Sequence, residues 1–257
     1  MSDRVNIDDR YPPEGEIREC ALPYKAFYDT LCYTFRNLDG LTSFCDVGCS
    51  NGLLLDIVRQ NHPSAHIAGI EYFSYHKDAA PNSVKDKIRI WDLRDPFDSS
   101  LGLKKYDVIV CTEVGEHIDP EHASTLLRNI RSLMHSGTKL IMSWSHTGGE
   151  DDKESDPKHQ HLNPLNRQSF MNLMLTSGFK FMSEQSQALV VNSFINTSFM
   201  DWWRLSLTVW KVNNSPEIST DYHEYEDLMR YLDWHTVKID VNGNVTMHEL
   251  VYSVNYG

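Results

Sequence analysis

The length, composition and charge of the chain set the first limits on its function. Its 257 residues are enough for one large domain or for one domain with an appendage, and 40% hydrophobic and 23% charged residues are ordinary for a soluble globular protein. No apolar run approaches the roughly 20 residues of a membrane-spanning helix, and the polar N-terminus lacks the apolar core of a secretory signal. A net charge of −12 disfavours a nucleic-acid substrate, because phosphate binding usually requires a basic face.

The cysteines indicate a reducing compartment. The chain has 5 cysteines, scattered and without a Cys-x-x-Cys pair, so neither a disulfide framework nor a zinc knuckle is predicted. Cys45 and Cys111 lie in apolar runs and are expected to be buried strand residues. A cytoplasmic location fits this cysteine usage best.

Strand-like and helix-like segments alternate from residue 43 to about residue 180. Strands are predicted at residues 43–47, 66–71, 88–91, 106–112 and 139–144, and helices at residues 53–63, 120–134 and 167–177. This alternation predicts an α/β fold with a doubly wound, mostly parallel sheet and right-handed crossovers. Strand-like runs at residues 179–191 and 205–212 are expected to complete a seven-stranded sheet with an antiparallel edge strand.

Three parts of the chain are predicted. Residues 1–40 form an N-terminal cap or helical segment, residues 41–213 the main α/β domain, and residues 214–257 a small C-terminal extension. The extension is expected to contain a helix at residues 224–232 and a β-hairpin that turns at Asn242-Gly243. Three roles stay open for it: completing a substrate pocket, pairing with a second subunit in a homodimer, or covering a sheet edge.

A turn with two glycines follows the first predicted strand. It reads Asp46-Val47-Gly48-Cys49-Ser50-Asn51-Gly52, and its glycines allow the backbone to turn tightly and to approach a ligand closely. In open α/β sheets such ligands bind at the carboxyl ends of the strands. The G-x-x-x-G spacing differs from the G-x-G-x-x-G of dinucleotide sites, and a P-loop would need Gly-Lys-Ser/Thr.

Acidic residues end the next three strands. Glu71 ends the second strand, where a carboxylate can accept hydrogen bonds from both hydroxyls of a ribose. Asp92 ends the third strand, where a short acid can accept from an adenine amino group. Thr112 and Glu113 end the fourth strand, beside a ligand that would contain this ribose and this adenine.

These motifs together resemble those of the class I S-adenosylmethionine-dependent methyltransferases over roughly residues 40 to 212. The matching positions are the turn at residues 46–52, Glu71, Asp92 and the run at residues 107–118, in the order and spacing of the family. The resemblance implies a Rossmann-like fold and S-adenosyl-L-methionine as the cofactor, with Tyr72 against the adenine. The implied cofactor-binding residues are Asp46, Gly48, Cys49, Ser50, Gly52, Glu71, Tyr72, Asp92, Leu93, Thr112 and Glu113.

The methyl acceptor is expected to be a small molecule or a glycan, methylated on a hydroxyl. Members of the family that methylate adenine or DNA nitrogens carry an Asn/Asp-Pro-Pro-aromatic motif, whereas this chain has Thr112-Glu113-Val114-Gly115. A Lys-Asp-Lys-Glu set, as in ribose-2′-O enzymes, is not evident. Methylation of nucleic acid, including an RNA cap, is therefore disfavoured but stays open.

Histidines are the candidate catalytic residues. Methyl transfer is an in-line displacement at a sulfonium carbon, so the protein mainly aligns the nucleophile and removes its proton. His117 follows the fourth strand, His146 follows the fifth, and His161 precedes the next helix. A packing or helix-capping role is the alternative for His117.

No metal site is expected, and two other functions stay open. His146, Asp151, Asp152, His159 and His161 have metal-ligating groups, but their spacing matches no specific site, and a solvated lid loop is the alternative. A non-catalytic protein that keeps the fold is one rival function. An NAD-dependent oxidoreductase is the other, disfavoured by the glycine spacing and by the lack of a Tyr-x-x-x-Lys pair.

Overall fold

The computed structural model describes residues 38, 40–144, 161–181, 187–193, 203–212, 234–239 and 245–252. In chain order the helices and strands are β1 (Ser43–Val47), α2 (Leu53–Asn61), β2 (His66–Glu71), α3 (Ser74–Ala79), β3 (Ile88–Ile90), β4 (Tyr106–Cys111), α4 (Ala123–Ser132), β5 (Met134–Met142), α5 (Arg167–Thr176), β6 (Phe179–Phe181), β7 (Gln187–Ser193), β8 (Trp203–Val212), β9 (Trp234–Ile239) and β10 (Val245–Tyr252). Single 3₁₀ turns lie between several of them, among them η4 (Gly115–His117) and η5 (Pro120–His122).

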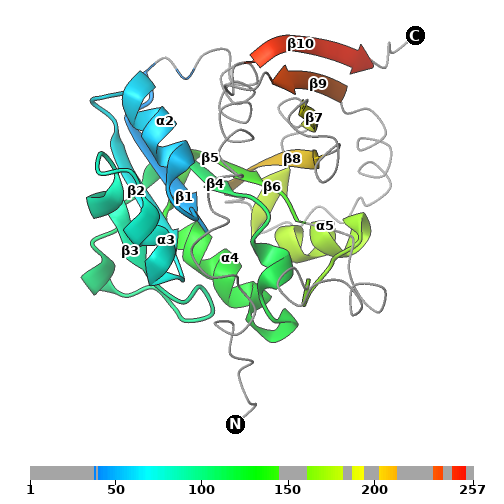
Figure 1. The fold of residues 1–257 in the computed structure, drawn as a ribbon. Helices are drawn as coiled ribbons and strands as arrows, with labels where there is room; N and C mark the ends of the chain where they lie inside the picture. Colours follow the sequence, from blue (N-terminus) through cyan, green and yellow to red (C-terminus); the bar gives the residue numbers. More distant parts are fainter. Residues whose placement is uncertain are drawn as a thin grey trace.

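Five parallel strands form the part of the sheet that the alternating pattern predicts. Their order is β3-β2-β1-β4-β5, and each neighbouring pair is parallel. The strand β1 lies in the middle of this order. From β1 the chain continues through β2 to β3 on one side, and it then crosses to β4 and β5 on the other side of β1 (Figure 1). The predicted doubly wound α/β sheet is therefore confirmed for these strands.

The predicted seven-stranded sheet, with an antiparallel edge at residues 179–191 and 205–212, is wrong. The described residues form 10 strands of one sheet, and β8 is antiparallel to β5 but lies inside the sheet, because β7 pairs with its other side. The run at residues 179–191 forms two strands, β6 and β7, which pair with successive parts of β8.

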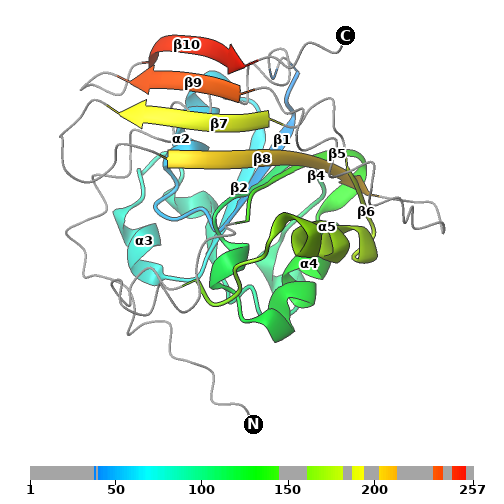
Figure 2. The same ribbon diagram turned by 90° about the vertical axis from the view of Figure 1, so that its right-hand side faces the viewer.

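The two strands predicted for the C-terminal hairpin extend this sheet, whereas the predicted turn at Asn242-Gly243 lies outside the described residues. β9 and β10 pair antiparallel, and β9 pairs with β7 in parallel, which satisfies backbone groups that an edge strand would leave unpaired (Figure 2). The helix predicted at residues 224–232 lies outside the described residues, and the domain boundaries at residues 40 and 213 stay predictions. Within the described ranges no helix is long and apolar enough to cross a membrane.

Both faces of the parallel strands are covered. The apolar residues of α4 repeat at helical spacing, and Leu126, Leu127 and Ile130 pack with α5 and with alternate strand residues in one core cluster. On the opposite face α2 packs close to β2, since a Cβ on Gly69 would overlap the Leu55 side chain. This burial on two faces explains why β4 is apolar almost throughout, and Cys111 at its end is fully buried as predicted.

One predicted helix is shorter than expected. The run at residues 120–134 begins as the 3₁₀ turn η5, continues as α4 and ends at Ser132, after which Met134 already belongs to β5. Met134 is apolar and buried, which fits the last turn of a helix as well as the start of a strand, so helical periodicity does not distinguish the two.

Candidate functional site

The turn between β1 and α2 is tied to the end of β2. The backbone N–H groups of Gly48 and Cys49 donate to the Ile70 carbonyl over 2.8 and 3.0 Å. The Ser50 N–H donates to Glu71 Oε2 over 2.8 Å. These bonds hold the turn and the acid that ends β2 against each other at the carboxyl edge of the sheet.

The glycines of this turn are required by conformation and by space. Gly48 has φ of 81° and Gly52 has φ of 71°, in the left-handed region that glycine adopts without strain. A Cβ on Gly48 would overlap the side chain of Val114, and a Cβ on Gly52 would lie 2.9 Å from Ile88 Cδ1. The close contact with Val114 places the turn after β1 directly beside the loop after β4.

Two buried acids lie next to each other at this edge. Asp46 is 4% exposed and Glu71 is 6% exposed. Burial, with a smaller contribution from the neighbouring Glu71 charge, raises the pKa of Asp46 to about 7. Burial also raises the pKa of the Cys49 thiol, whose sulfur packs toward Gly69. Cys49 is therefore an apolar side chain here, and only its backbone is available to a ligand.

The Glu71 carboxylate is held in a fixed position. Besides the bond from Ser50, its Oε1 accepts a bond of 3.0 Å from the Phe73 N–H. The Nδ1 atom of His76 lies 3.2 Å from the same oxygen. Each carboxylate oxygen has two lone pairs, so Glu71 keeps capacity to accept hydrogen bonds from a ligand.

Asp92 has a partner that the sequence analysis does not anticipate. The Arg94 guanidinium donates to it from Nε over 2.9 and 3.0 Å and from Nη2 over 2.8 Å, and Nη1 lies 3.4 Å from Asp119. The hydrogen bonds that Arg94 donates to Asp92, with a smaller contribution from the one to Asp119, raise the pKa of Arg94, so its charge is permanent. The opposite charges two residues apart in the sequence were the available signal for this pair.

The other residues expected around the adenine lie close to this ion pair. The Tyr72 ring has the Arg94 Cζ atom 5.9 Å from its centroid. The Leu93 side chain is buried in the core cluster, and its carbonyl accepts a hydrogen bond of 3.2 Å from Asn129 Nδ2.

The end of β4 is fixed by Ser143. The Ser143 hydroxyl donates to Glu113 Oε1 over 2.7 Å, and the Glu113 N–H donates to that hydroxyl over 2.9 Å. Glu113 has φ of 55°, which is uncommon for a residue with a side chain and is held by these bonds. Thr112, the residue before it, is half-buried.

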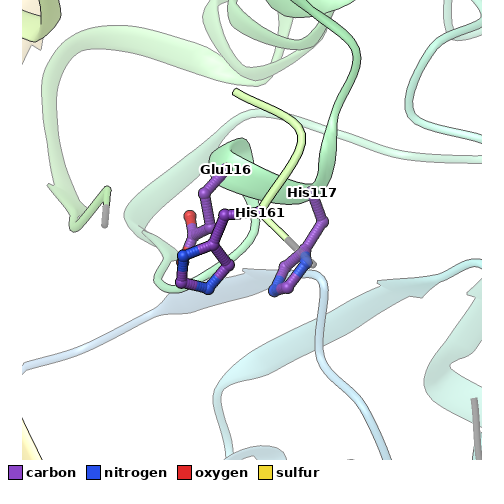
Figure 3. A group of neighbouring side chains, drawn as sticks. All are labelled: Glu116, His117 and His161. Carbon is purple, nitrogen blue, oxygen red and sulfur yellow. The ribbon is translucent and has the colours of Figure 1, made fainter. Parts of the chain in front are cut away.

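Glu116, His117 and His161 converge after β4 (Figure 3). Glu116 and His117 belong to η4, whereas His161 comes from a segment 44 residues further along the chain. The two imidazole rings are 5.1 Å apart between centroids and nearly perpendicular. His117 and His161 are thus brought together as candidate residues, and Glu116 joins them although no role was expected for it. His146 lies outside the described residues.

The sequence of residues 20–184 matches the family described as "Methyltransferase domain". This match spans more than half of the chain. The chain belongs to the S-adenosylmethionine-dependent methyltransferases. No curated protein matches the methyltransferase significantly.

Solved structures similar to the methyltransferase share its fold at low sequence identity. An O-methyltransferase from a polyketide synthase of Brevibacillus brevis, in complex with S-adenosyl-L-homocysteine, is 12% identical with a TM-score of 0.57, covering 88% of this chain and 89% of that one. Magnesium protoporphyrin IX methyltransferase from Synechocystis, with bound S-adenosylmethionine, is 17% identical with a TM-score of 0.50, covering 79% and 86%. A candidate O-methyltransferase from Nostoc punctiforme is 15% identical with a TM-score of 0.51. The match covers 74% of this chain but only 56% of that protein.

The edge formed by β1, β2 and β4 suits the cofactor of this family chemically. S-adenosylmethionine carries an ammonium, a sulfonium and two ribose hydroxyls, all of which interact favourably with carboxylates. Asp46 and Glu71 supply carboxylates that are buried at this edge. The rival NAD-dependent oxidoreductase is not supported, because the family match covers this whole edge.

Proposed function

We propose that this methyltransferase transfers the methyl group of S-adenosylmethionine to a hydroxyl of a small molecule or a glycan. The observation that carries the proposal is the cluster of Glu116, His117 and His161 beside the glycine turn. Val114 connects the two, because it contacts Gly48 on one side and directly precedes η4 on the other. An acceptor near the cofactor methyl group would therefore lie next to imidazole nitrogens.

The cofactor in this proposal lies along the carboxyl ends of the strands. Asp46 and residues 48–52 hold the methionine part, and Glu71 accepts from the ribose hydroxyls. Tyr72, Asp92 and the Leu93 backbone surround the adenine, with the Asp92 carboxylate shared between the ligand and Arg94. Thr112 and Glu113 line the side of the cofactor next to β4.

The reaction needs little covalent chemistry from the protein. The acceptor oxygen forms a bond to the methyl carbon, the carbon–sulfur bond breaks, and its electron pair stays on sulfur as S-adenosylhomocysteine. The hydroxyl proton is transferred to the cluster. His117 or His161 can accept it as a general base, or can accept a hydrogen bond from the hydroxyl. His146 stays a further candidate from the sequence.

Charge and the similar structures support the class of acceptor. The net charge of −12 works against a phosphate backbone, which favours an acceptor without many negative charges. Several proteins with a similar fold are O-methyltransferases, one of them within a polyketide synthase. The charge thus favours an acceptor with few negative charges, and the similar structures favour oxygen as the methylated atom.

The test is transfer of radiolabelled methyl groups to four acceptor sets: phenolic and polyketide hydroxyls, oligosaccharides, small amines, and capped RNA. We expect label on a hydroxyl of the first or second set. His117→Gln and His161→Gln should each lower kcat by roughly 100-fold, the lower range for loss of general acid–base catalysis. His135→Gln is the matched control, since His135 pairs with Asp107 at the start of β4. Label found only on amines or RNA would contradict the proposed acceptor.

A further inference from the structure

We infer that Glu116, His117 and His161 form a binding site for a divalent transition-metal ion. Each residue offers one ligand atom, a carboxylate oxygen or an imidazole nitrogen, and these atoms all lie within 4.8 Å of one another. Figure 3 shows the three side chains converging from two separate segments of the chain. Zinc-type ions bind such ligands at about 2.0–2.2 Å, which places the ligand atoms roughly 3–4 Å apart. Small rotations of the side chains therefore close the site around an ion.

The backbone fixes the two segments against each other. The Glu116 carbonyl accepts hydrogen bonds from the N–H groups of Leu162 and Asn163 over 2.7 and 2.9 Å. The Asn163 carbonyl in turn accepts a bond of 2.7 Å from Trp144 Nε1. The Trp144 ring also packs against Gly115, the residue before Glu116. Such anchoring of the ligand-bearing segments is what a metal site requires for affinity.

Burial gives the carboxylate a reason to hold a cation. Glu116 is 0% exposed, and a carboxylate withdrawn from water is costly unless positive charge lies close to it. The two imidazoles can supply that charge in two ways, by binding a metal ion together with Glu116 or by protonation of one ring. The two possibilities differ in whether the protein takes up a metal ion.

The ligands indicate which ions fit. Imidazole suits zinc, copper, iron and nickel better than it suits magnesium or calcium, which prefer oxygen ligands, and Mn²⁺ also takes oxygen ligands such as the Glu116 carboxylate. Three protein ligands leave at least one coordination position open, as in catalytic metal sites. If the proposed function holds, an acceptor hydroxyl would occupy that position, and the metal ion would replace the two imidazoles as the group that promotes loss of the hydroxyl proton, which would then leave to water. Metal binding itself does not depend on that function.

This site differs from the group of metal-ligating residues that the sequence suggests. The expectation of no metal rested on the spacing of His146, Asp151, Asp152, His159 and His161 within a single segment. The cluster in the structure takes only His161 from that set and combines it with two residues of η4. Ligands that come from distant segments are not visible as a spacing pattern.

The experiment is calorimetric titration of the chelator-treated full chain with Mn²⁺, Zn²⁺ and Mg²⁺, without cofactor or acceptor, together with electron paramagnetic resonance of Mn²⁺. We expect one Mn²⁺ or Zn²⁺ ion per chain and much weaker binding of Mg²⁺. His117→Gln and His161→Gln should each weaken transition-metal binding by at least roughly ten-fold. His135→Gln, which removes an imidazole at the opposite edge of the sheet, should bind as the unmodified protein does.

Two results would overturn the site: no uptake of Mn²⁺ or Zn²⁺ by the unmodified protein, or equal affinity in both cluster variants. Circular dichroism confirms that each variant is folded, and Glu116→Gln, which keeps the shape of the buried side chain, provides a third variant. The titration contains no methyl donor, so a failure of the proposed hydroxyl methylation would leave its outcome unchanged. Conversely, hydroxyl methylation by a protein that binds no transition metal would keep the function and remove the site.

Discussion

Asp46 is the residue at which folding and the proposed cofactor binding oppose each other. Burial raises its pKa to about 7, so the folded protein holds a proton on a carboxyl that the unfolded chain releases near 3.8. A cationic ligand such as the methionine part of the cofactor would instead favour the charged carboxylate. The charged carboxylate, which the ligand needs, therefore lowers the free energy of unfolding at neutral pH.

The sign of this effect gives a prediction. Between pH 4 and pH 7 the folded state binds more protons at Asp46 than the unfolded state does, so its contribution to the free energy of unfolding falls as pH rises. We expect Asp46→Asn, which cannot ionise, to remove this fall and to unfold with on the order of 2–4 kcal/mol more free energy at pH 8. Urea denaturation at pH 5 and pH 8 measures both. The same variant should bind S-adenosylmethionine more weakly.

The control for Asp46 is an acid that water already solvates. Asp78 has a side chain that is 74% exposed, and Asp78→Asn should leave the pH dependence of unfolding as it is in the unmodified protein. Equal curves for Asp46→Asn and the unmodified protein would show that the buried acid does not hold its proton.

At the scale of elements, the turn from β1 to α2 and the loop after β4 form one packed unit. Gly48 has φ of 81° and its Cα faces the Val114 side chain without room for a Cβ. By contrast, Gly102 has a similar φ of 61° but open space around it. The two glycines separate the cost of backbone strain from the cost of steric overlap.

We expect Gly48→Ala to lower the free energy of unfolding by about 2–4 kcal/mol and Gly102→Ala by only about 1 kcal/mol. The alanine at position 102 would be strained only by its left-handed backbone, whereas the alanine at position 48 would also overlap Val114. The double variant Gly48→Ala with Val114→Ala should recover the steric part of the loss. Urea denaturation of the three variants checks this order. Equal losses for the two single variants would mean that Val114 yields and that the contact does not hold the two loops together.

At the scale of the whole molecule, the parallel half of the fold was predictable from local patterns. The runs at residues 43–47 and 66–71 coincide with β1 and β2, because apolar residues between turn signals define short buried strands. The antiparallel pair of β9 and β10 was equally readable from its strand-like runs. The positions of Asp46 and Glu71 at one edge follow from the parallel order of these strands.

What the sequence left open depends on contacts between distant segments. No local pattern shows that β9 pairs with β7, so the sheet was expected to end too early. The contact of Arg94 with Asp119 and the approach of His161 to Glu116 are likewise tertiary contacts. Residue types suggested candidates for the site, but only the fold shows which of them meet.

The central claim is that the edge formed by β1 and β2 binds the adenosyl cofactor, and calorimetry tests it most directly. The protein is titrated with S-adenosylmethionine, S-adenosylhomocysteine and NAD, and the titration is repeated on Glu71→Gln and on Glu121→Gln, an exposed acid, as control. We predict micromolar binding of both adenosyl compounds and no binding of NAD. Glu71→Gln should bind the adenosyl compounds at least roughly ten-fold more weakly, since a hydrogen bond to a charged acceptor contributes about 1.5–3 kcal/mol. Glu121→Gln should bind them as the unmodified protein does. Absence of adenosyl binding, or unchanged affinity in Glu71→Gln, would contradict it.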